Sequence, residues 1–306
     1  MEESATRLDQ ALVQLGLARS RSQAQDYLQA GRVTVAGKTI TKPAYRLAPG
    51  QVPQLHAAQE PEYLSRAGGK LAGALMQFGA AQQGAAGLDP RGKHCLDVGA
   101  CTGGFTGVLL EAGAASVLAV DVGHNQLLPQ LREDPRVTAL DGVNARELPA
   151  ALRDHQAERI SLVVGDLSFI SLTMVLPAIT ETINGGDLVL LIKPQFEVGR
   201  ERLGRGGVVR NDADRQFAVH QVLESGTNLG LQLRGLTTSE VPGTTGNIEY
   251  LVWFTKPVDN PEWHTPNAGN VSDTEKIGET PPGALNSAQI AALAQTVVAE
   301  GQVVFP

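Results

Sequence analysis

Short apolar runs alternate with segments of helical length from Tyr63 onward, and this alternation restricts the possible folds more than any other feature of the chain. Six of the runs have the length and composition of strands: HCLDVG, SVLAVDVG, RVTALDG, ISLVVGDLS, DLVLLIKP and EYLVWF. The segments between them, such as GFTGVLLEAG and LTMVLPAITETI, are long enough for a helix. Because strands that alternate with helices form parallel sheets covered on both faces, we predict an α/β fold with a doubly wound, mostly parallel sheet.

One of these strands ends in an unexpected charge. Lys193 follows the apolar run LVLLI and precedes Pro194, although a strand covered on both faces has no place for an unpaired ammonium group. Asp166 follows a similar run, LVVG. Because the carboxyl ends of parallel strands share the edge at which α/β proteins bind ligands, we expect Lys193 and Asp166 to converge there. The pair would then tune a proton transfer, or it would be a structural ion pair only.

A glycine-rich segment, LDVGACTGGF, joins the first of the strands to a helix. The unpaired amide groups at the start of a helix favour a bound ligand, and glycine lets that ligand approach the backbone closely. We therefore predict that this loop binds a cofactor through Gly99, Ala100, Gly103, Gly104 and Phe105.

The carboxylates around this loop indicate which cofactor it binds. Asp121 ends the next strand, about twenty residues after Gly99, where an acidic side chain accepts hydrogen bonds from ribose hydroxyls. Asp97 would repel a pyrophosphate but would pair with the ammonium group of an amino acid, which favours S-adenosylmethionine over NAD. Asp141 and Asn144 follow the third strand as candidates for adenine contacts, although a polar turn explains them nearly as well.

The first fifty residues form a separate, small unit in our interpretation. Leucines at helical spacing predict a first helix that ends at Gly16, with Leu8, Leu12 and Leu15 on one face. A second helix is predicted from Ser20 or Ser22 to Gly31. Val33 and Val35 then alternate into a hairpin with a Gly37-Lys38 turn.

This unit is basic, because residues 1–50 hold seven Lys or Arg and four Asp or Glu. The basic side chains would form a phosphate-binding face, or they would be scattered over a solvated surface: Arg7, Arg19, Arg21, Arg32, Lys38, Lys42 and Arg46. The segment RLDQALVQLGLARSRSQAQDYLQAGRVTVAGKTITKP resembles the S4 RNA-binding domain. The resemblance implies a module that docks on structured RNA through its basic helical face.

The remaining boundaries follow from composition. The segment GQVPQLHAAQEP, which begins at Gly50, has no hydrophobic periodicity. We therefore predict that residues 51–62 connect the two domains. Residues 63–256 hold the α/β domain. Residues 257–306 contain one basic and six acidic residues and are predicted to be a largely disordered tail. Within it, NSAQIAALAQTVVAEG predicts a short helix capped by Ser287, to which we assign no role.

Four further motifs resemble those of one enzyme family. The segments SRAGGKL, DLSFIS, IKPQFE and GNIEYL place Lys70, Asp166, Lys193 and Glu249 at positions that match the Lys-Asp-Lys-Glu tetrad of the FtsJ-type RNA ribose 2′-O-methyltransferases. With the S4-like segment and DVGACTGGFT, the chain is similar to the TlyA (hemolysin A) family from Thr6 to about Phe254.

The resemblance implies a Rossmann-like methyltransferase that uses S-adenosylmethionine. Its expected substrate is the 2′-oxygen of cytidine in ribosomal RNA of the small subunit, with the large subunit as a second candidate. We expect Lys193 to act as the base, although Lys70 remains an alternative, because a hydroxyl must lose its proton as it attacks a methyl group. Asp166 would orient Lys193 and also face the cofactor, and Glu249 would position the ribose.

Additional residues are candidates for RNA contacts. Ser65 and Arg66 precede the GGK turn, and the loop GRERLGRGGVVRNDADR carries several arginines, of which Arg205 and Arg210 are our main candidates; the others are Arg200, Arg202 and Arg215. A mobile, solvated loop is the alternative for this segment. Phe169 and Phe196 could stack on a base, but we favour core packing for both.

Other classes of protein receive less support. The sequence contains no apolar stretch long enough to span a membrane and no secretory signal, so we expect a cytoplasmic protein and no haemolytic pore. Cys95, Cys101 and the six histidines lack the spacing of metal ligands. A ribosome-binding module without catalytic activity is the strongest competing hypothesis. We expect a monomer whose partners are ribosomal RNA and ribosomal subunits.

Overall fold

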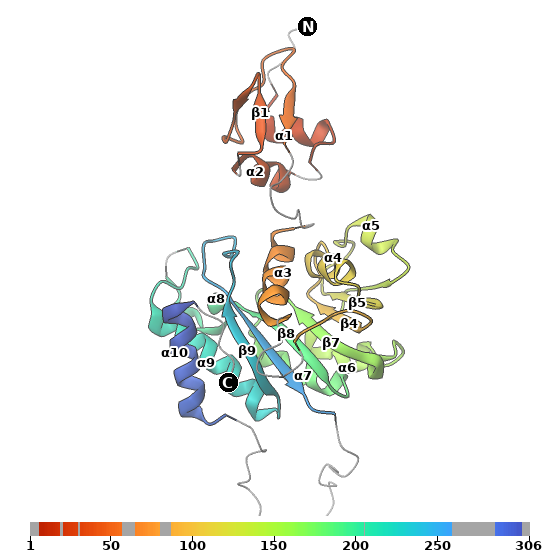
Figure 1. The fold of residues 1–306 in the computed structure, drawn as a ribbon, viewed down its shortest axis with the longest axis vertical. Coiled ribbons are helices and arrows are strands. Elements are labelled where there is room, and N and C mark those ends of the chain that lie inside the picture. The colour runs from red at the N-terminus through yellow and green to blue at the C-terminus, as the bar shows by residue number, and fades with distance from the viewer. Residues whose placement is uncertain are drawn as a thin grey trace, which may run out of the picture. The chain divides into compact units, whose positions relative to one another are not determined.

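The computed structural model describes residues 6–18, 21–29, 31–56, 65–79, 87–204, 206–258 and 285–301. The chain divides into two compact units, Met1–Glu62 and Tyr63–Pro306, which are described separately below (Figure 1). In the larger unit, the predicted doubly wound, mostly parallel sheet is confirmed.

The N-terminal unit packs two helices against a small antiparallel sheet. The helices are α1 (Leu8–Gln14) and α2 (Arg21–Gln29), and the strands are β1 (Val33–Val35), β2 (Lys38–Thr39) and β3 (Pro53–Leu55), in the order β2-β1-β3. Fully buried leucine and valine side chains from both helices and from β1 form the core: Leu8, Leu12, Leu28 and Val33. The unit therefore has a hydrophobic core of its own.

Three sequence predictions for this unit need correction. Leu15 lies beyond the end of α1 and is 55% exposed, so it does not extend the buried face of that helix. The hairpin turn consists of Ala36 and Gly37, both with positive φ, because Val35 pairs with Lys38. Residues 53–55, which we had assigned to the connector, form β3 and pair with β1. Strand β3 has only three residues, too few to show an alternating pattern. It tolerates Pro53, which has no amide donor, because it lies at the edge of the sheet.

The C-terminal unit contains a seven-stranded sheet in the order β6-β5-β4-β7-β8-β10-β9. Five strands are parallel: β4 (His94–Val98), β5 (Ser116–Asp121), β6 (Val137–Asp141), β7 (Ile160–Gly165) and β8 (Gly186–Ile192). Strand β10 (Tyr250–Lys256) is antiparallel to both of its neighbours, β8 and β9 (Gln232–Thr238). Strand β9, QLRGLTT, was not predicted, because its composition is too polar for a buried strand and it lies at the edge of the sheet.

Helices cover both faces of this sheet (Figure 1). The longer ones are α3 (Arg66–Gly79), α4 (Gly104–Glu111), α7 (Leu176–Thr182), α9 (Asp212–Asn228) and α10 (Ser287–Glu300). Short helical segments connect them: α5 (Pro129–Arg132), α6 (Leu148–Ala151), α8 (Pro194–Glu197), η1 (Ala145–Glu147), η2 (Ala157–Arg159), η3 (Leu172–Met174) and η4 (Arg200–Arg202).

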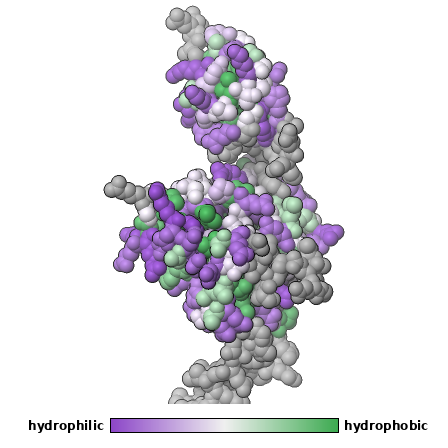
Figure 2. Space-filling view, turned by 60° about the vertical axis from the view of Figure 1, so that its left-hand side comes forward, coloured by the Kyte–Doolittle hydropathy of each residue, from purple (hydrophilic) through white to green (hydrophobic). Residues whose placement is uncertain are grey.

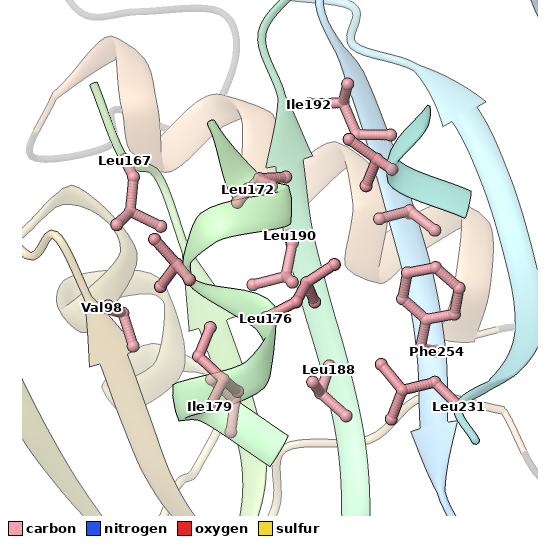
Figure 3. Close-up of a cluster of buried hydrophobic side chains, with 14 of the residues drawn as sticks. Val98, Leu167, Leu172, Leu176, Ile179, Leu188, Leu190, Ile192, Leu231 and Phe254 are labelled. Atoms are coloured by element: carbon pink, nitrogen blue, oxygen red, sulfur yellow. The ribbon is translucent and has the colours of Figure 1, made fainter. Parts of the chain in front are cut away.

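Strand β8 shows why its sequence is almost entirely apolar. Leu188, Leu190 and Ile192 point into one core cluster, together with Leu176 of α7 and Phe254 of β10 (Figure 3). The alternate residues of β8 point into a second cluster on the opposite face, which contains Val189 and Leu191. Because both faces are buried, the strand cannot alternate apolar with polar residues.

The helix predicted near the C-terminus is present as α10, and it packs onto the larger unit. Ile290, Ala294 and Val297 are almost fully buried and belong to the same core cluster as β8. The N-cap is Asn286, whose side chain accepts from the amide of Gln289 in a capping box, rather than the predicted Ser287. The role that the sequence left open is therefore packing against α9 and β9.

Polar and charged side chains, interspersed with a few hydrophobic ones, cover the face shown in Figure 2. Within the described ranges, none of the helices is both long and apolar enough to span a bilayer.

Candidate active site

The glycine-rich loop leaves the carboxyl end of β4 and enters α4, as predicted. Gly99 and Gly103 have φ values of +84° and +94°, which favour glycine at both positions. A Cβ atom on Gly99 would lie 3.1 Å from the carbonyl oxygen of Asp166, so this loop runs directly against the segment that follows β7. The loop and the segment therefore form adjoining walls at one edge of the sheet.

The start of α4 also packs tightly against the start of α3. A Cβ atom on Gly104 would overlap the hydroxyl of Ser65 and would lie 3.0 Å from Ala67 Cβ. The Ser65 Oγ atom is buried, and it has no hydrogen-bond partner in the described part of the chain. The sequence made Ser65 a candidate for a contact with RNA phosphate, but its hydroxyl lies beside the glycine-rich loop.

Asp97 is the most buried carboxylate in this region, with an exposed fraction of 0%. Its Oδ2 atom accepts a 2.6 Å hydrogen bond from Thr106 Oγ1, while Oδ1 has no partner among the described residues. Burial raises the pKa of Asp97 to about 7, and the neighbouring charge of Asp166 contributes in the same direction. A buried carboxylate oxygen that lacks a donor matches a ligand that carries an ammonium group.

Asp121, Asp141 and Asn144 hold the adjacent loops in place. Asp121 accepts from the amides of Cys101 at 2.8 Å and Gly123 at 2.7 Å, and so joins the ends of β4 and β5. Asp141 forms an ion pair with the Arg132 guanidinium at 2.8 Å, which lowers the pKa of Asp141. The Asn144 side chain accepts from the Arg146 amide and caps η1. Each of these predicted cofactor contacts therefore already has a local structural role.

Two other residues of the predicted cofactor site are buried. Phe105 is 2% exposed and packs in the core, as does Ala100 at 7% exposed. Neither side chain is available to a ligand, so any contact from these two positions has to come from the backbone.

Lys193 and Asp166 meet at the carboxyl edge of the sheet. The Lys193 Nζ atom lies 2.6 Å from Asp166 Oδ1, and it donates to Ser168 Oγ at 2.8 Å. The side chains of Lys193 and Asp166 are 10% and 13% exposed. Ser168 was missed in the sequence, although its position two residues after Asp166, beyond the end of a buried strand, was a usable signal.

Lys70 and Glu249 form a second pair at the same edge. The Lys70 Nζ atom donates to Glu249 Oε2 at 2.5 Å, and the two side chains are 8% and 2% exposed. Gln195 Nε2 donates to the other carboxylate oxygen, Oε1, at 3.1 Å. The pairing of Tyr250 with Ile192 brings Glu249 beside the end of β8, next to Lys193. Gln195, which sequence reasoning did not single out, lies two residues after Lys193 and ties Glu249 to the segment that carries this lysine.

Phe169 is 91% exposed, so the expectation that it packs in the core was wrong. Its backbone has a φ of +65°, a conformation that side-chain-bearing residues adopt only under strain. The ring contacts that of Phe196, with a centroid separation of 5.3 Å, and Phe196 is only partly buried. An exposed aromatic ring beside the Lys193 pair offers a stacking surface.

The arginines of the segment after β8 fall into two groups. Arg202 pairs with Asp214 at 3.2 Å and stacks on Phe217. Arg215, which is 13% exposed, donates to the carbonyl oxygens of Val209 and Arg210. Both arginines have partners close to this segment, but only Arg215 is largely buried, whereas Arg202 is 48% exposed. Arg200, Arg210 and Arg66 are exposed, while Arg205 lies outside the described residues. Arg66 also donates to the carbonyl oxygen of Pro242 at 3.0 Å.

In the N-terminal unit, Asp9 gathers two of the predicted RNA-binding arginines. This carboxylate is 0% exposed and accepts from Arg7, Arg21 and Gln25 at 3.0 to 3.2 Å. Its pKa is well below the usual range, chiefly because of the hydrogen bond from Arg7.

Two other candidates of this unit have described surroundings of their own. Arg32 stacks on Tyr27 and donates to the carbonyl oxygen of His56. Lys38 is exposed on β2, and Arg19 lies outside the described residues. Among the residues whose positions are described, no group of three or more His, Cys, Asp or Glu side chains could hold a metal ion.

Comparisons with known proteins identify the families of the two units. The family model of the FtsJ-like methyltransferases matches residues 63–256, and that of the S4 domain matches residues 6–52. The chain is 44% identical over 255 residues to the 16S/23S rRNA (cytidine-2′-O)-methyltransferase TlyA of Mycobacterium tuberculosis, covering 83% of this chain and 91% of that protein. It is 38% identical to Hemolysin A of Brachyspira hyodysenteriae, covering 81% of this chain and 99% of the relative. A solved structure from Streptococcus thermophilus, also named a hemolysin, superposes with a TM-score of 0.63 at 36% identity, covering 84% of this chain and 90% of that chain.

Proposed function

This chain belongs to the FtsJ-like methyltransferase family and carries an S4 domain, and from this premise we propose that it transfers a methyl group from S-adenosylmethionine to the ribose 2′-oxygen of cytidine in ribosomal RNA. The observation that carries the proposal is the meeting of two lysine–carboxylate pairs, Lys193–Asp166 and Lys70–Glu249, at the edge of the sheet where the glycine-rich loop opens. The names of the TlyA relatives support cytidine and both ribosomal subunits as substrates.

The residues around the glycine-rich loop fit S-adenosylmethionine. The unpartnered Oδ1 atom of Asp97 would accept from the ammonium group of the methionine moiety, and the buried hydroxyl of Ser65 offers a further polar contact. Asp121, at the end of β5, would hold the ribose of the cofactor. Gly99 and Gly104 let the loop pack directly against the segments that carry Asp166 and Ser65, where a Cβ atom would come too close to its neighbours. When bound, S-adenosylmethionine supplies an electrophilic methyl group on its sulfonium.

The pair formed by Lys193 is better placed for proton transfer than that formed by Lys70. The backbone of Asp166 lies next to Gly99, and its side chain pairs with Lys193. The Lys193 Nζ atom is therefore held close to the glycine-rich loop. In its neutral form, Lys193 would accept the proton of the 2′-hydroxyl as the oxygen attacks, while Asp166 and Ser168 keep Nζ in place. Lys70, held by Glu249, would position the ribose.

Exposed groups around the pairs would hold the RNA. Arg66, Arg200 and Arg210 provide cationic groups for phosphates. Phe169 offers its exposed ring to a nucleobase that has left its stack. The S4 unit would add phosphate contacts through its basic residues, including Arg7 and Arg21.

The test is a methyl-transfer assay with labelled S-adenosylmethionine and ribosomal subunits from cells that lack this gene, followed by mapping of 2′-O-methyl groups. Lys193→Ala is expected to lower the rate by about a hundredfold to ten-thousandfold with unchanged cofactor binding, because the general base is lost. The matched control is Lys93→Ala, because Lys93 is also a paired lysine, 2.7 Å from Asp187, at the opposite edge of the sheet.

The outcomes separate the competing hypotheses. Label on a cytidine ribose that disappears in Lys193→Ala but persists in Lys93→Ala would support both the reaction and the base. Label that persists in Lys193→Ala would limit Lys193 to a structural role. Binding of S-adenosylmethionine and ribosomal subunits without any incorporation would favour a ribosome-binding module without catalytic activity.

A further inference from the structure

A buried asparagine joins two loops that border the catalytic edge. Asn247 lies in the loop between β9 and β10, two residues before Glu249, and is 1% exposed. Its Oδ1 atom accepts from the amide of Val209 at 2.9 Å, and its Nδ2 atom donates to the carbonyl oxygen of Gly207 at 2.9 Å. Val209 and Gly207 belong to the loop between η4 and α9, which carries Arg210.

The asparagine side chain is well suited to this position. One amide group supplies both the acceptor for the Val209 amide and the donor for the Gly207 carbonyl, and it also donates to Thr245 Oγ1 at 3.0 Å. An aspartate would keep the acceptor but would face the Gly207 carbonyl with a carboxylate oxygen, which cannot donate when ionised. The partly buried carbonyl oxygen of Gly207 would then lose this donor.

The arginine-bearing loop is held at the same place from its other side. The Val209 side chain is 2% exposed and packs with Val198 and Ala218. Arg215 of α9 donates to the carbonyl oxygens of Val209 and Arg210 at 3.1 and 2.9 Å. The backbone next to Arg210 is thus fixed by two independent side chains, whereas the Arg210 side chain itself is exposed.

Glu249 does not depend on Asn247 for its own partners, because Lys70 and Gln195 occupy its two carboxylate oxygens. A loss of the Asn247 contacts would therefore loosen the arginine-bearing loop more than the catalytic pairs.

We propose that Asn247 is a positioning residue that fixes Arg210 relative to the catalytic edge, so that an RNA phosphate bound by Arg210 places the target ribose in register with the lysine pairs. This inference rests on the proposed methyl transfer to ribosomal RNA. Through Asn247, the loop that carries Glu249 and the loop that carries Arg210 act as one surface.

Steady-state kinetics on ribosomal subunits test the proposal with Asn247→Ala and Asn247→Asp. Loss of both loop contacts in Asn247→Ala, or of the Gly207 contact in Asn247→Asp, is expected to raise KM for the RNA, about tenfold in the alanine variant, with kcat lowered less than threefold and cofactor affinity unchanged. The control is Asp187→Ala, which removes a partly buried partner of Trp253, Thr255 and Lys93 at the opposite edge of the sheet and should lower stability without raising KM. A lower kcat at unchanged KM in both Asn247 variants would overturn the proposal, because it would indicate only a smaller folded fraction.

A double-mutant cycle distinguishes positioning from general support. Arg210→Ala alone should raise KM about tenfold, and in the Asn247→Ala background it should raise KM less than twofold, because the arginine has already lost its position. Effects that simply multiply would overturn the proposed link between Asn247 and Arg210.

Two further measurements remain decisive if transfer is absent or a variant does not fold. Filter binding of labelled ribosomal RNA measures Kd in place of KM, and the ratios of Kd between each variant and the unmodified chain should equal the expected ratios of KM. This measurement distinguishes failure of the reaction from failure of the positioning role. Hydrogen exchange on the unmodified chain should show a strongly protected Val209 amide. Rapid exchange of that amide would contradict the Asn247 contact itself.

Discussion

Replacing Asp97 by asparagine is expected to change stability and cofactor binding in opposite directions. The carboxyl group is completely buried, and its pKa is raised from an ordinary value of 3.8 to about 7. A raised carboxyl pKa means that the folded chain holds a proton that the unfolded chain releases between these two pH values. The stabilisation that the protonated Asp97 contributes is therefore fully present below about pH 4 and is lost as the pH rises toward 7.

The size of this effect follows from the pKa difference. About three pKa units at about 1.36 kcal/mol each amount to roughly 4 kcal/mol for a completely buried group. The asparagine side chain of the Asp97→Asn variant cannot ionise, so the free energy of unfolding of this variant relative to the unmodified chain should increase by roughly this amount between pH 4 and pH 8. Urea unfolding without cofactor, followed by the fluorescence of the buried Trp253, measures the difference at each pH.

Cofactor binding should show the opposite preference. The Oδ1 atom of Asp97, which lacks a partner within the described ranges, is the proposed acceptor for the ammonium group of S-adenosylmethionine. Loss of that charge should weaken binding about a hundredfold in calorimetry at pH 7.5. Parallel stability curves for the two chains would refute the raised pKa of Asp97, and equal cofactor affinities would refute its contact with the ammonium group.

Four other substitutions test further parts of the structure. Gly104→Ala should abolish measurable cofactor binding and lower the melting temperature, because the new methyl group would overlap Ser65. Gly73→Ala in α3 should instead stabilise the chain by about 0.5–1 kcal/mol, because alanine has a higher helix propensity than glycine. Asp9→Ala should cost the N-terminal unit about 1–3 kcal/mol, seen as faster hydrogen exchange in α1 of the full chain with unchanged exchange in β4. Asp187→Ala should destabilise the larger unit by about 2–4 kcal/mol in urea unfolding while cofactor affinity is kept; a matching loss of affinity would contradict the separation of the two sheet edges.

The sequence located the edge of the sheet that holds the two lysine–carboxylate pairs, because its main signals are local. Buried strands read as apolar runs, and polar residues that follow such runs lie at the ends of strands. This reasoning brought Asp166 and Lys193 together without a structure, and the resemblance to a known tetrad added Lys70 and Glu249. Strand β9 and residues 53–55 escaped the same reasoning, because edge strands bury less apolar surface and carry a weaker pattern.

The tertiary structure alone decided how these residues are used. Lys70 and Glu249 are 179 residues apart, and only the register between β8 and β10 brings Glu249 beside Gln195 and Lys193.

The same is true of the arginines and the aromatic side chains. Arg215 and Arg210 are equally charged in the sequence, yet the fold buries one as a loop support and exposes the other. Phe169 was expected in the core, but a turn with positive φ places it in solvent. Periodicity reports which face of an element is buried, whereas the partner of a polar side chain depends on packing between distant segments, which only the folded chain defines.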